Sequence, residues 1–173
     1  TRRKNKNENC FFRSEKMNIL YTAFNGKCNS SKVLLDLLCV ENKLYLKNSF
    51  KTSVEQLENN LQKNTYDLIV SFGMSPLSYN SISIETIAKG EESYKTNFKF
   101  NYLKKCLELN NYNVVISKDA GGYLCNNIYY NGLKYIHSNN LKTDMIFIHI
   151  PKVDKITDIK KLSKTFEKYF KFN

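Results

Sequence analysis

The sequence predicts an α/β fold of the phosphorylase/hydrolase-like kind. It has three layers (α/β/α), with a mostly parallel central sheet between two layers of helices. Short apolar runs alternate along the chain with segments that repeat apolar residues at helical spacing. Two runs, 67–73 and 145–150, are almost continuously apolar, which is usual where both faces of a parallel sheet are covered. The 173 residues are 42% hydrophobic, enough for one buried core.

The first half of the chain predicts three strands and two helices. The strands are expected at 17–22, around 44–46, and at 67–73. Ser30 or Ser31 can cap the first helix, and Thr52 with Glu55 forms a T-x-x-E capping box for the second. The apolar stripes of these helices are Val33, Leu34, Leu37 and Leu38 in the first, and Val54, Leu57 and Leu61 in the second.

The second half predicts three further strands and three helices. The strands are expected at 82–85, 113–117 and 145–150, where Pro151 stops the last one. The helices follow from apolar residues at spacings of three and four. Their residues are Leu103, Cys106, Leu107 and Asn110 in the weakest, Leu124, Ile128, Tyr135 and Ile136 in the next, and Ile159, Leu162, Phe166 and Phe170 in the last.

The charge divides the chain into a tail and a body. Residues 1–16 carry a net +4 of the total +11, and we expect them to be a basic, polar, disordered extension. Residues 17–173 are expected to form a single α/β domain. All three arginines lie in the tail, so the positive charge of the body comes from lysine alone. Because phosphate and base-edge recognition favours the planar arginine side chain, a nucleic-acid partner is disfavoured.

The five cysteines are scattered, at positions 10, 28, 39, 106 and 125, with neither a C-x-x-C pair nor a metal-ligand cluster. This spacing suits a reducing compartment better than a disulfide framework. No apolar run approaches the length of a membrane span, and no secretory h-region is visible. We therefore expect a cytoplasmic protein that needs no membrane.

Chemistry-bearing residues gather near a glycine pair and the last strand. Cys125 follows Gly121 and Gly122, where a strand turns into a helix, and His149 closes strand 145–150. We expect both at the carboxyl ends of their strands, the edge where the sites of open α/β sheets gather. The helix N-terminus and a neighbouring histidine would lower the thiol pKa of Cys125. This pair predicts a cysteine hydrolase.

A third group should orient the imidazole, and Glu85, which closes strand 82–85, is the best candidate. Free backbone N–H groups in the first turn after Cys125 would stabilise an oxyanion. Each residue alone also has an ordinary structural interpretation. Cysteine is commonly a small buried apolar residue, a histidine inside a strand is commonly a core residue, and a glutamate beside lysines is commonly a surface residue.

Two segments carry a recognisable pattern, A-G-G-Y-L-C-N at 120–126 and F-I-H-I-P at 147–151. They resemble the pyroglutamyl peptidase I family of cysteine peptidases, whose members carry A-G-[TG]-[YF]-[LV]-C-N and F-I-H-[VI]-P in this order. The segment 84–88 looks like the family's glutamate segment, and the similarity spans most of 17–153. The resemblance implies that Cys125 is the nucleophile, His149 the acid/base and Glu85 its orienting partner.

The resemblance also implies a substrate and a set of contacts. The reaction would be removal of an N-terminal pyroglutamate from a peptide through a thioester acyl-enzyme, with no cofactor. Phe24, Asn29, Tyr123 and Leu124 match substrate-binding positions. Family members often associate into dimers or tetramers, which makes a homo-oligomer an expectation here.

The chain departs from the family pattern at two loops. After Phe24 it lacks the E-P-F-G that follows in the family, and after strand 67–72 it reads G-M-S-P-L where the family has G-Q-A-G-G-R. An arginine near the oxyanion is therefore absent, which leaves Lys89, Lys118 or a backbone amide to take its place. Two alternatives stay open: a weak or inactive relative that binds a peptide or protein, and a cysteine hydrolase with another acyl substrate.

Overall fold

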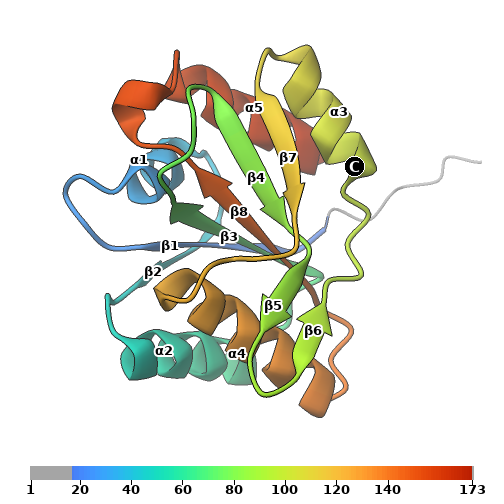
Figure 1. Ribbon diagram of the computed structural model, residues 1–173. Helices are drawn as coiled ribbons and strands as arrows, with labels where there is room; N and C mark the ends of the chain where they lie inside the picture. Colours follow the sequence, from blue (N-terminus) through green and yellow to red (C-terminus); the bar gives the residue numbers. More distant parts are fainter. Residues whose placement is uncertain (1–16, 173) are drawn as a thin grey trace, which may run out of the picture.

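The computed structural model describes residues 17–172 and contains a six-stranded sheet with the strand order β2-β1-β3-β8-β4-β7 (Figure 1). The expected tail, residues 1–16, lies outside the described residues. The strands are β1 (Ile19–Phe24), β2 (Asn42–Leu46), β3 (Leu68–Met74), β4 (Ser81–Glu85), β5 (Ile87–Lys89), β6 (Ser93–Lys95), β7 (Asn113–Ser117) and β8 (Asp144–Ile150). The helices are α1 (Ser30–Leu37), α2 (Phe50–Lys63), α3 (Asn101–Leu109), α4 (Leu124–Ser138) and α5 (Ile159–Phe172), with a 3-10 turn η1 (Val153–Lys155).

The sheet changes direction once. β2, β1, β3 and β8 pair in parallel, and β4 pairs in parallel with β7, but β4 runs antiparallel to β8. We call this β8–β4 boundary the seam; its register pairs Ser83 with His149, Ile84 with Ile148, and Glu85 with Phe147. The prediction of a mostly parallel sheet between helices is confirmed, with one antiparallel contact inside it.

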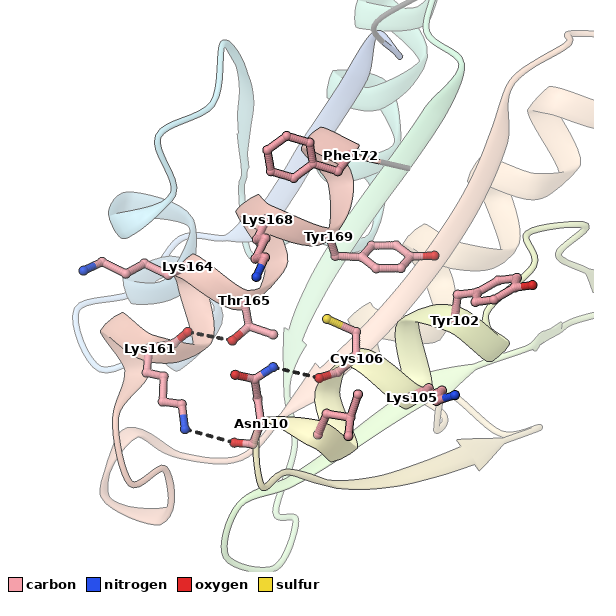
Figure 2. A pocket seen from close by; sticks show the side chains of 11 residues that line it. Tyr102, Lys105, Cys106, Asn110, Lys161, Lys164, Thr165, Lys168, Tyr169 and Phe172 are labelled. Carbon is pink, nitrogen blue, oxygen red and sulfur yellow. Dashed lines mark hydrogen bonds between the residues drawn. The ribbon is translucent and has the colours of Figure 1, made fainter. Parts of the chain in front are cut away.

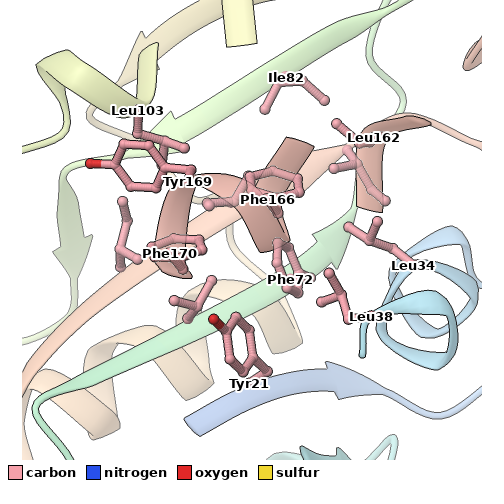
Figure 3. Packing of buried hydrophobic residues seen from close by; sticks show 14 of the residues in the cluster. Tyr21, Leu34, Leu38, Phe72, Ile82, Leu103, Leu162, Phe166, Tyr169 and Phe170 are labelled. Atoms are coloured by element: carbon pink, nitrogen blue, oxygen red, sulfur yellow. The ribbon is translucent and has the colours of Figure 1, made fainter. Parts of the chain in front are cut away.

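Two helical layers cover the two faces of the sheet (Figure 1). Helices α1, α3 and α5 pack on one face, and α2 and α4 pack on the other with the β5–β6 hairpin beside α4. Figure 3 shows the first of these interfaces, in which Phe166 of α5 contacts Phe72 of β3 with ring centroids 5.2 Å apart. Burial of these apolar side chains is the main stabilising contribution to the fold.

Both predicted helix caps are wrong by a few residues. Asn29 caps α1, because its Oδ1 accepts hydrogen bonds from the Ser31 N–H and Oγ–H. Ser49 caps α2, because its hydroxyl accepts from the Thr52 N–H, so Thr52 lies inside the first turn. Short polar side chains just before a helix satisfy its free N–H groups. In both cases an earlier polar residue reaches those groups first.

Two features of the strands differ from the prediction. The first strand extends to Phe24, which is buried at its end rather than lying in the following loop. The β5–β6 hairpin was not predicted, since its two strands have only three residues each. Its turn lies against α4, where a Cβ on Gly90 would come within 2.3 Å of the Tyr130 ring. Glycine permits this close approach.

Candidate active site

A buried carboxylate–imidazole pair lies at the seam. Nδ1 of His149 is 2.9 Å from Oε1 of Glu85, and the two residues are 6% and 2% exposed. The rings of Phe147 and His149 lie 4.9 Å apart between centroids, so the imidazole also has an apolar wall. With Nδ1 engaged by the carboxylate, Nε2 is the ring nitrogen left to exchange a proton elsewhere.

The surroundings of Glu85 favour its charged form. Burial by itself raises the pKa of Glu85, but hydrogen bonding from His149 and the hydroxyls of Ser117 and Ser83 outweighs it and lowers the pKa below its usual range. Ser83 Oγ donates to Oε1 at 2.7 Å. The Tyr129 hydroxyl donates to the Glu85 backbone carbonyl at 2.9 Å and fixes the strand end. The carboxylate is thus held charged beside the imidazole.

Cys125 lies on the same face of the sheet as this pair. It is the second residue of α4 and packs with Phe147 in the core beneath α2 and α4. A Cβ built on Gly73 would lie 2.9 Å from the Cys125 Sγ and 2.7 Å from the Phe147 ring. Gly73 pairs with His149 across β3 and β8, so the sulfur sits above the strand neighbour of the histidine. Only a residue without a side chain leaves this space open.

The thiol differs from the sequence expectation. Burial, with a smaller contribution from the charge of Glu85, raises the pKa of Cys125 to about 11. Low polarity around the sulfur disfavours the thiolate more than the helix N-terminus favours it. The expected lowering of the pKa is therefore wrong, and Cys125 is a protonated thiol at neutral pH. An adjacent base must remove its proton before the sulfur can act as a nucleophile.

Because of the antiparallel seam, Cys125, Glu85 and His149 come near one another in a different way from the one expected. Cys125 follows β7, which runs antiparallel to β8, so the ends of β7 and β8 are at opposite edges of the sheet. Glu85 and His149 instead lie close across the antiparallel pairing. The loop of residues 118–123 brings Cys125 back over the face of the sheet (Figure 1). The expectation of a shared carboxyl edge is wrong.

The start of α4 carries backbone N–H groups that its N-cap side chain does not engage. Its N-cap residue, Tyr123, makes no side-chain capping hydrogen bond. Backbone N–H groups of such a turn can stabilise an anion. Lys89, one candidate to replace an arginine, instead pairs with Asp119 at 2.8 Å on the surface. Among residues 17–172, no group of three or more His, Cys, Asp or Glu side chains could hold a metal ion.

Comparison with known proteins finds a similarity to one family of peptidases. The model of the pyroglutamyl peptidase family matches residues 88–167, a stretch that includes Cys125 and His149. Pyrrolidone-carboxylate peptidase 1 of Caldanaerobacter subterraneus is 26% identical over 132 residues, 63% of this chain and 64% of the relative. Pyrrolidone-carboxylate peptidase of Brachyspira hyodysenteriae is 29% identical over 136 residues, 64% of this chain and 66% of the relative. The chain is similar to the pyroglutamyl peptidase family over this stretch.

Solved structures of pyroglutamyl peptidases share the fold of this chain. A pyrrolidone carboxyl peptidase of Fervidobacterium islandicum superposes with a TM-score of 0.77 at 21% identity, covering 90% of this chain and 97% of the other. Pyroglutamyl peptidase I of Bacillus amyloliquefaciens gives 0.78 at 17% identity, covering 88% and 94%. The chain matches just under two thirds of the length of the two curated relatives above. None of the helices within residues 17–172 has the length and apolar character needed to cross a membrane.

The four substrate-binding candidates predicted from the sequence occupy different environments. Phe24 and Leu124 are buried in the core beneath α2 and α4, and Asn29 caps α1 with its side-chain oxygen. Tyr123 is exposed and forms an edge-to-face pair with Phe50, with ring centroids 5.3 Å apart. Sequence reasoning missed Phe50, although it extends the stripe of Val54, Leu57 and Leu61 by one turn. The predicted helix, capped by Thr52, began three residues too late to include it.

Two cavities differ in their relation to Cys125. The larger, about 510 Å³, lies between α3 and α5, on the face of the sheet opposite to α4 (Figure 2). Four lysines line it together with exposed apolar side chains; the lysines are Lys105, Lys161, Lys164 and Lys168. The other, about 410 Å³, is lined by Gly122, Tyr123 and Asn126, which flank Cys125 in the chain. The candidate catalytic residues and the larger cavity therefore lie on different faces of the sheet.

Proposed function

We propose that this chain is a cysteine-type pyroglutamyl peptidase that removes N-terminal pyroglutamate from peptides. One observation carries the proposal: the Cys125 sulfur lies above Gly73, the strand partner of His149, whose Nδ1 is held by the buried Glu85. Nucleophile, base and orienting carboxylate are the parts of a thiol peptidase. The substrate follows from the family and from the names of the relatives, which are pyrrolidone-carboxylate peptidases.

The chemistry begins with Cys125 as a protonated thiol. As the sulfur attacks the pyroglutamyl carbonyl carbon, Nε2 of His149 takes the thiol proton and a C–S bond forms. Glu85 stabilises the resulting imidazolium, and the backbone N–H groups at the start of α4 stabilise the oxyanion. The C–N bond then breaks, and the imidazolium gives its proton to the departing amine.

The second half of the cycle restores the thiol. His149 removes a proton from water as the water oxygen attacks the thioester carbon. The C–S bond breaks, the sulfur regains a proton from the imidazolium, and free pyroglutamate leaves. No oxidation or reduction takes place. Because the sulfur must remain a thiol, the proposal places the enzyme in a reducing, cytoplasmic setting.

Release of a fluorophore from an L-pyroglutamyl amide tests this function. With reductant present, we expect the wild type to release the fluorophore and Cys125→Ala to fall to background. Cys106→Ala, which changes a half-buried cysteine on the opposite face, is the matched control and should retain activity. Equal rates from the wild type and Cys125→Ala would reject the proposal.

The assembly is a separate part of the proposal. Glu85, Cys125 and His149 all come from one chain, so one chain supplies the proposed catalytic residues. The family resemblance adds the expectation of a dimer or tetramer. Analytical ultracentrifugation of the full chain at assay concentration would distinguish these from a monomer.

A further inference from the structure

Ser83 lies on β4, beside the carboxylate–imidazole pair at the seam. It is 5% exposed, and the register of the seam places it directly opposite His149. Because side chains two residues apart on a strand point to the same face, Ser83 and Glu85 lie on one face of the sheet. The Ser83 hydroxyl donates to Oε1 of Glu85 at 2.7 Å. One strand therefore supplies both the carboxylate and a hydroxyl that binds it.

The hydrogen bonds of the Glu85 carboxylate converge on one of its two oxygens. Oε1 accepts from Ser83 Oγ at 2.7 Å and lies 2.9 Å from Nδ1 of His149. Oε2 is buried and has no hydrogen-bond partner in the part of the chain that the structure describes. Ser117 lies close enough to lower the pKa of Glu85, but its hydroxyl donates to the Asp119 carbonyl at 3.2 Å. The orientation of the carboxylate therefore depends on the two contacts of Oε1.

These two contacts are not equivalent. The contact with His149 joins the carboxylate to the imidazole that it must orient, so it gives no independent reference for that orientation. The contact with Ser83 does, because it comes from the strand that carries Glu85. It is also a hydrogen bond from an O–H group to a charged carboxylate, a strong type. Without it the carboxylate would keep only the contact with the imidazole and could turn together with it.

The charged and titratable groups that face Glu85 are few. Within the described residues, its only ion-pair partner is His149 of β8. From α4 it faces Cys125 and Tyr129, whose pKa values are raised by burial and, to a smaller extent, by the charge of Glu85, so both are neutral at neutral pH. β4 and β7 contribute hydroxyls and no charged group. Loss of the Ser83 hydroxyl would therefore leave a buried charge with little else to stabilise it.

We propose that Ser83 is a positioning residue of the peptidase, whose hydroxyl fixes the Glu85 carboxylate so that Glu85 can orient and stabilise the His149 imidazole during proton transfer. The inference rests on the proposed function. Ser83 acts through Glu85 and not on the substrate itself. Its hydroxyl contributes to both halves of the cycle, because His149 becomes an imidazolium in acylation and again in deacylation.

Ser83→Ala tests this role through the rate of fluorophore release from an L-pyroglutamyl amide by the full chain. We expect kcat to fall about 10–100-fold, the range for loss of one hydrogen bond to a charged group, while KM changes less than about twofold. The acid limb of the pH profile of kcat should also move to higher pH. The hydroxyl favours the charged carboxylate, so without it Glu85 binds a proton more readily as the pH falls.

Two further variants separate positioning from stability. Ser83→Thr keeps a hydroxyl at the same place on the strand, so it should restore most of kcat and the acid limb of the wild type. Ser163→Ala is the matched control, because Ser163 is a buried serine of α5, on the opposite face, whose hydroxyl donates to the Lys160 carbonyl at 2.8 Å. It should keep both kcat and the acid limb. Circular dichroism and urea titration would establish that each variant is folded.

The wild-type kcat and acid limb in Ser83→Ala would overturn the inference. A lower kcat with an unmoved acid limb, or a folded Ser83→Thr that is as slow as Ser83→Ala, would also overturn it, by assigning Ser83 to packing alone. An equal loss in Ser163→Ala would do the same. In each of these cases the proposed function stands, because the wild type still releases the fluorophore. No release by the wild type would instead overturn the proposed function, and the inference with it.

Discussion

The two faces of the sheet carry cavities of similar size but different chemistry. Between α3 and α5 the larger cavity holds four lysines and exposed apolar groups such as Tyr102 and Phe172 (Figure 2). The smaller cavity lies on the α2/α4 side, and beneath α4 the charged Glu85 carboxylate pairs with His149, on the face of the sheet that also carries Cys125. A buried titratable cluster is costly to maintain, so it marks a functional site better than volume does.

The difference between the two faces shows how the fold places polar side chains in its core. The seam reverses strand direction, which lets Glu85 on β4 face His149 on β8 across paired backbones. Gly73 on β3 then leaves room for the sulfur from α4. The lysine-lined cavity has none of these devices, because its walls are two helices that meet over the sheet.

The largest effect on the buried side is expected for Glu85→Gln. The neutral amide cannot stabilise the imidazolium, and it can hold the wrong tautomer, so kcat should fall about 10²–10⁴-fold with KM much less affected. The pH dependence of kcat should change as well, which a purely structural role would not cause. Tyr102→Ala, on the other face, should change kcat less than about twofold. Equal losses in the two variants would remove the distinction between the faces.

A second prediction concerns the reactivity of the buried thiol. Because its pKa is raised to about 11, Cys125 of the free enzyme is protonated at neutral pH, and its thiolate fraction grows with pH up to that value. Its rate of alkylation by iodoacetamide should rise about tenfold per pH unit between pH 7 and 10. Peptide mapping by mass spectrometry separates it from the exposed Cys28 and Cys39, which should react first at neutral pH. A rate for Cys125 that is already high and flat at pH 7 would instead indicate a thiolate–imidazolium pair.

Gly73→Ala sharpens the comparison at the level of stability. The added methyl group would meet the Cys125 sulfur and the Phe147 ring at less than 3 Å, so the core must shift. We expect the free energy of unfolding to fall by about 1–3 kcal/mol in urea titrations. Gly122→Ala is the matched control, because a Cβ there meets no atom within 4 Å. A Gly73→Ala protein as stable as Gly122→Ala would show that the space above β3 is not tightly packed.

The smallest effect is expected from the lysines of the other face. Lys161→Ala and Lys168→Ala change groups that line the larger cavity, far from the seam. Surface substitutions of this kind usually alter stability by less than about 0.5 kcal/mol. Hydrolysis of a pyroglutamyl amide should therefore proceed at the wild-type rate in both. A loss of more than about tenfold would connect the larger cavity to catalysis and break the comparison.

Sequence patterns predicted much of the fold, and they singled out Glu85 and His149, which the structure pairs at the seam. Continuous apolar runs such as 67–73 predicted the central strands, because burial on both faces demands them. The seam was not predictable, since strand direction depends on which strands pair and not on local composition. Phe24 becomes core because β1 extends farther than its pattern suggested. Phe50 was missed because the predicted helix began after it, and its contact with Tyr123 joins segments far apart in the sequence.

The thiol pKa shows a further limit of sequence patterns. Its position at a helix N-terminus indicated a lowered value, but the sign of the shift depends on burial above Gly73 and on the charge of Glu85. Neither quantity is contained in the spacing of residues. Under the proposed function, a thiol with a raised pKa requires a neighbouring base to remove its proton.

Acid quench of the full chain with a pyroglutamyl ester, followed by intact-mass and peptide mass spectrometry, tests the central claim most directly. An ester acylates a thiol readily, so a slow thioester hydrolysis step leaves the adduct populated. We predict a pyroglutamyl adduct on the peptide that contains Cys125, larger in Glu85→Gln if deacylation is slowed more than acylation, and absent in Cys125→Ser. Turnover of the ester with no adduct on Cys125, or with the same turnover in Cys125→Ser, would contradict the assignment of Cys125 as the nucleophile.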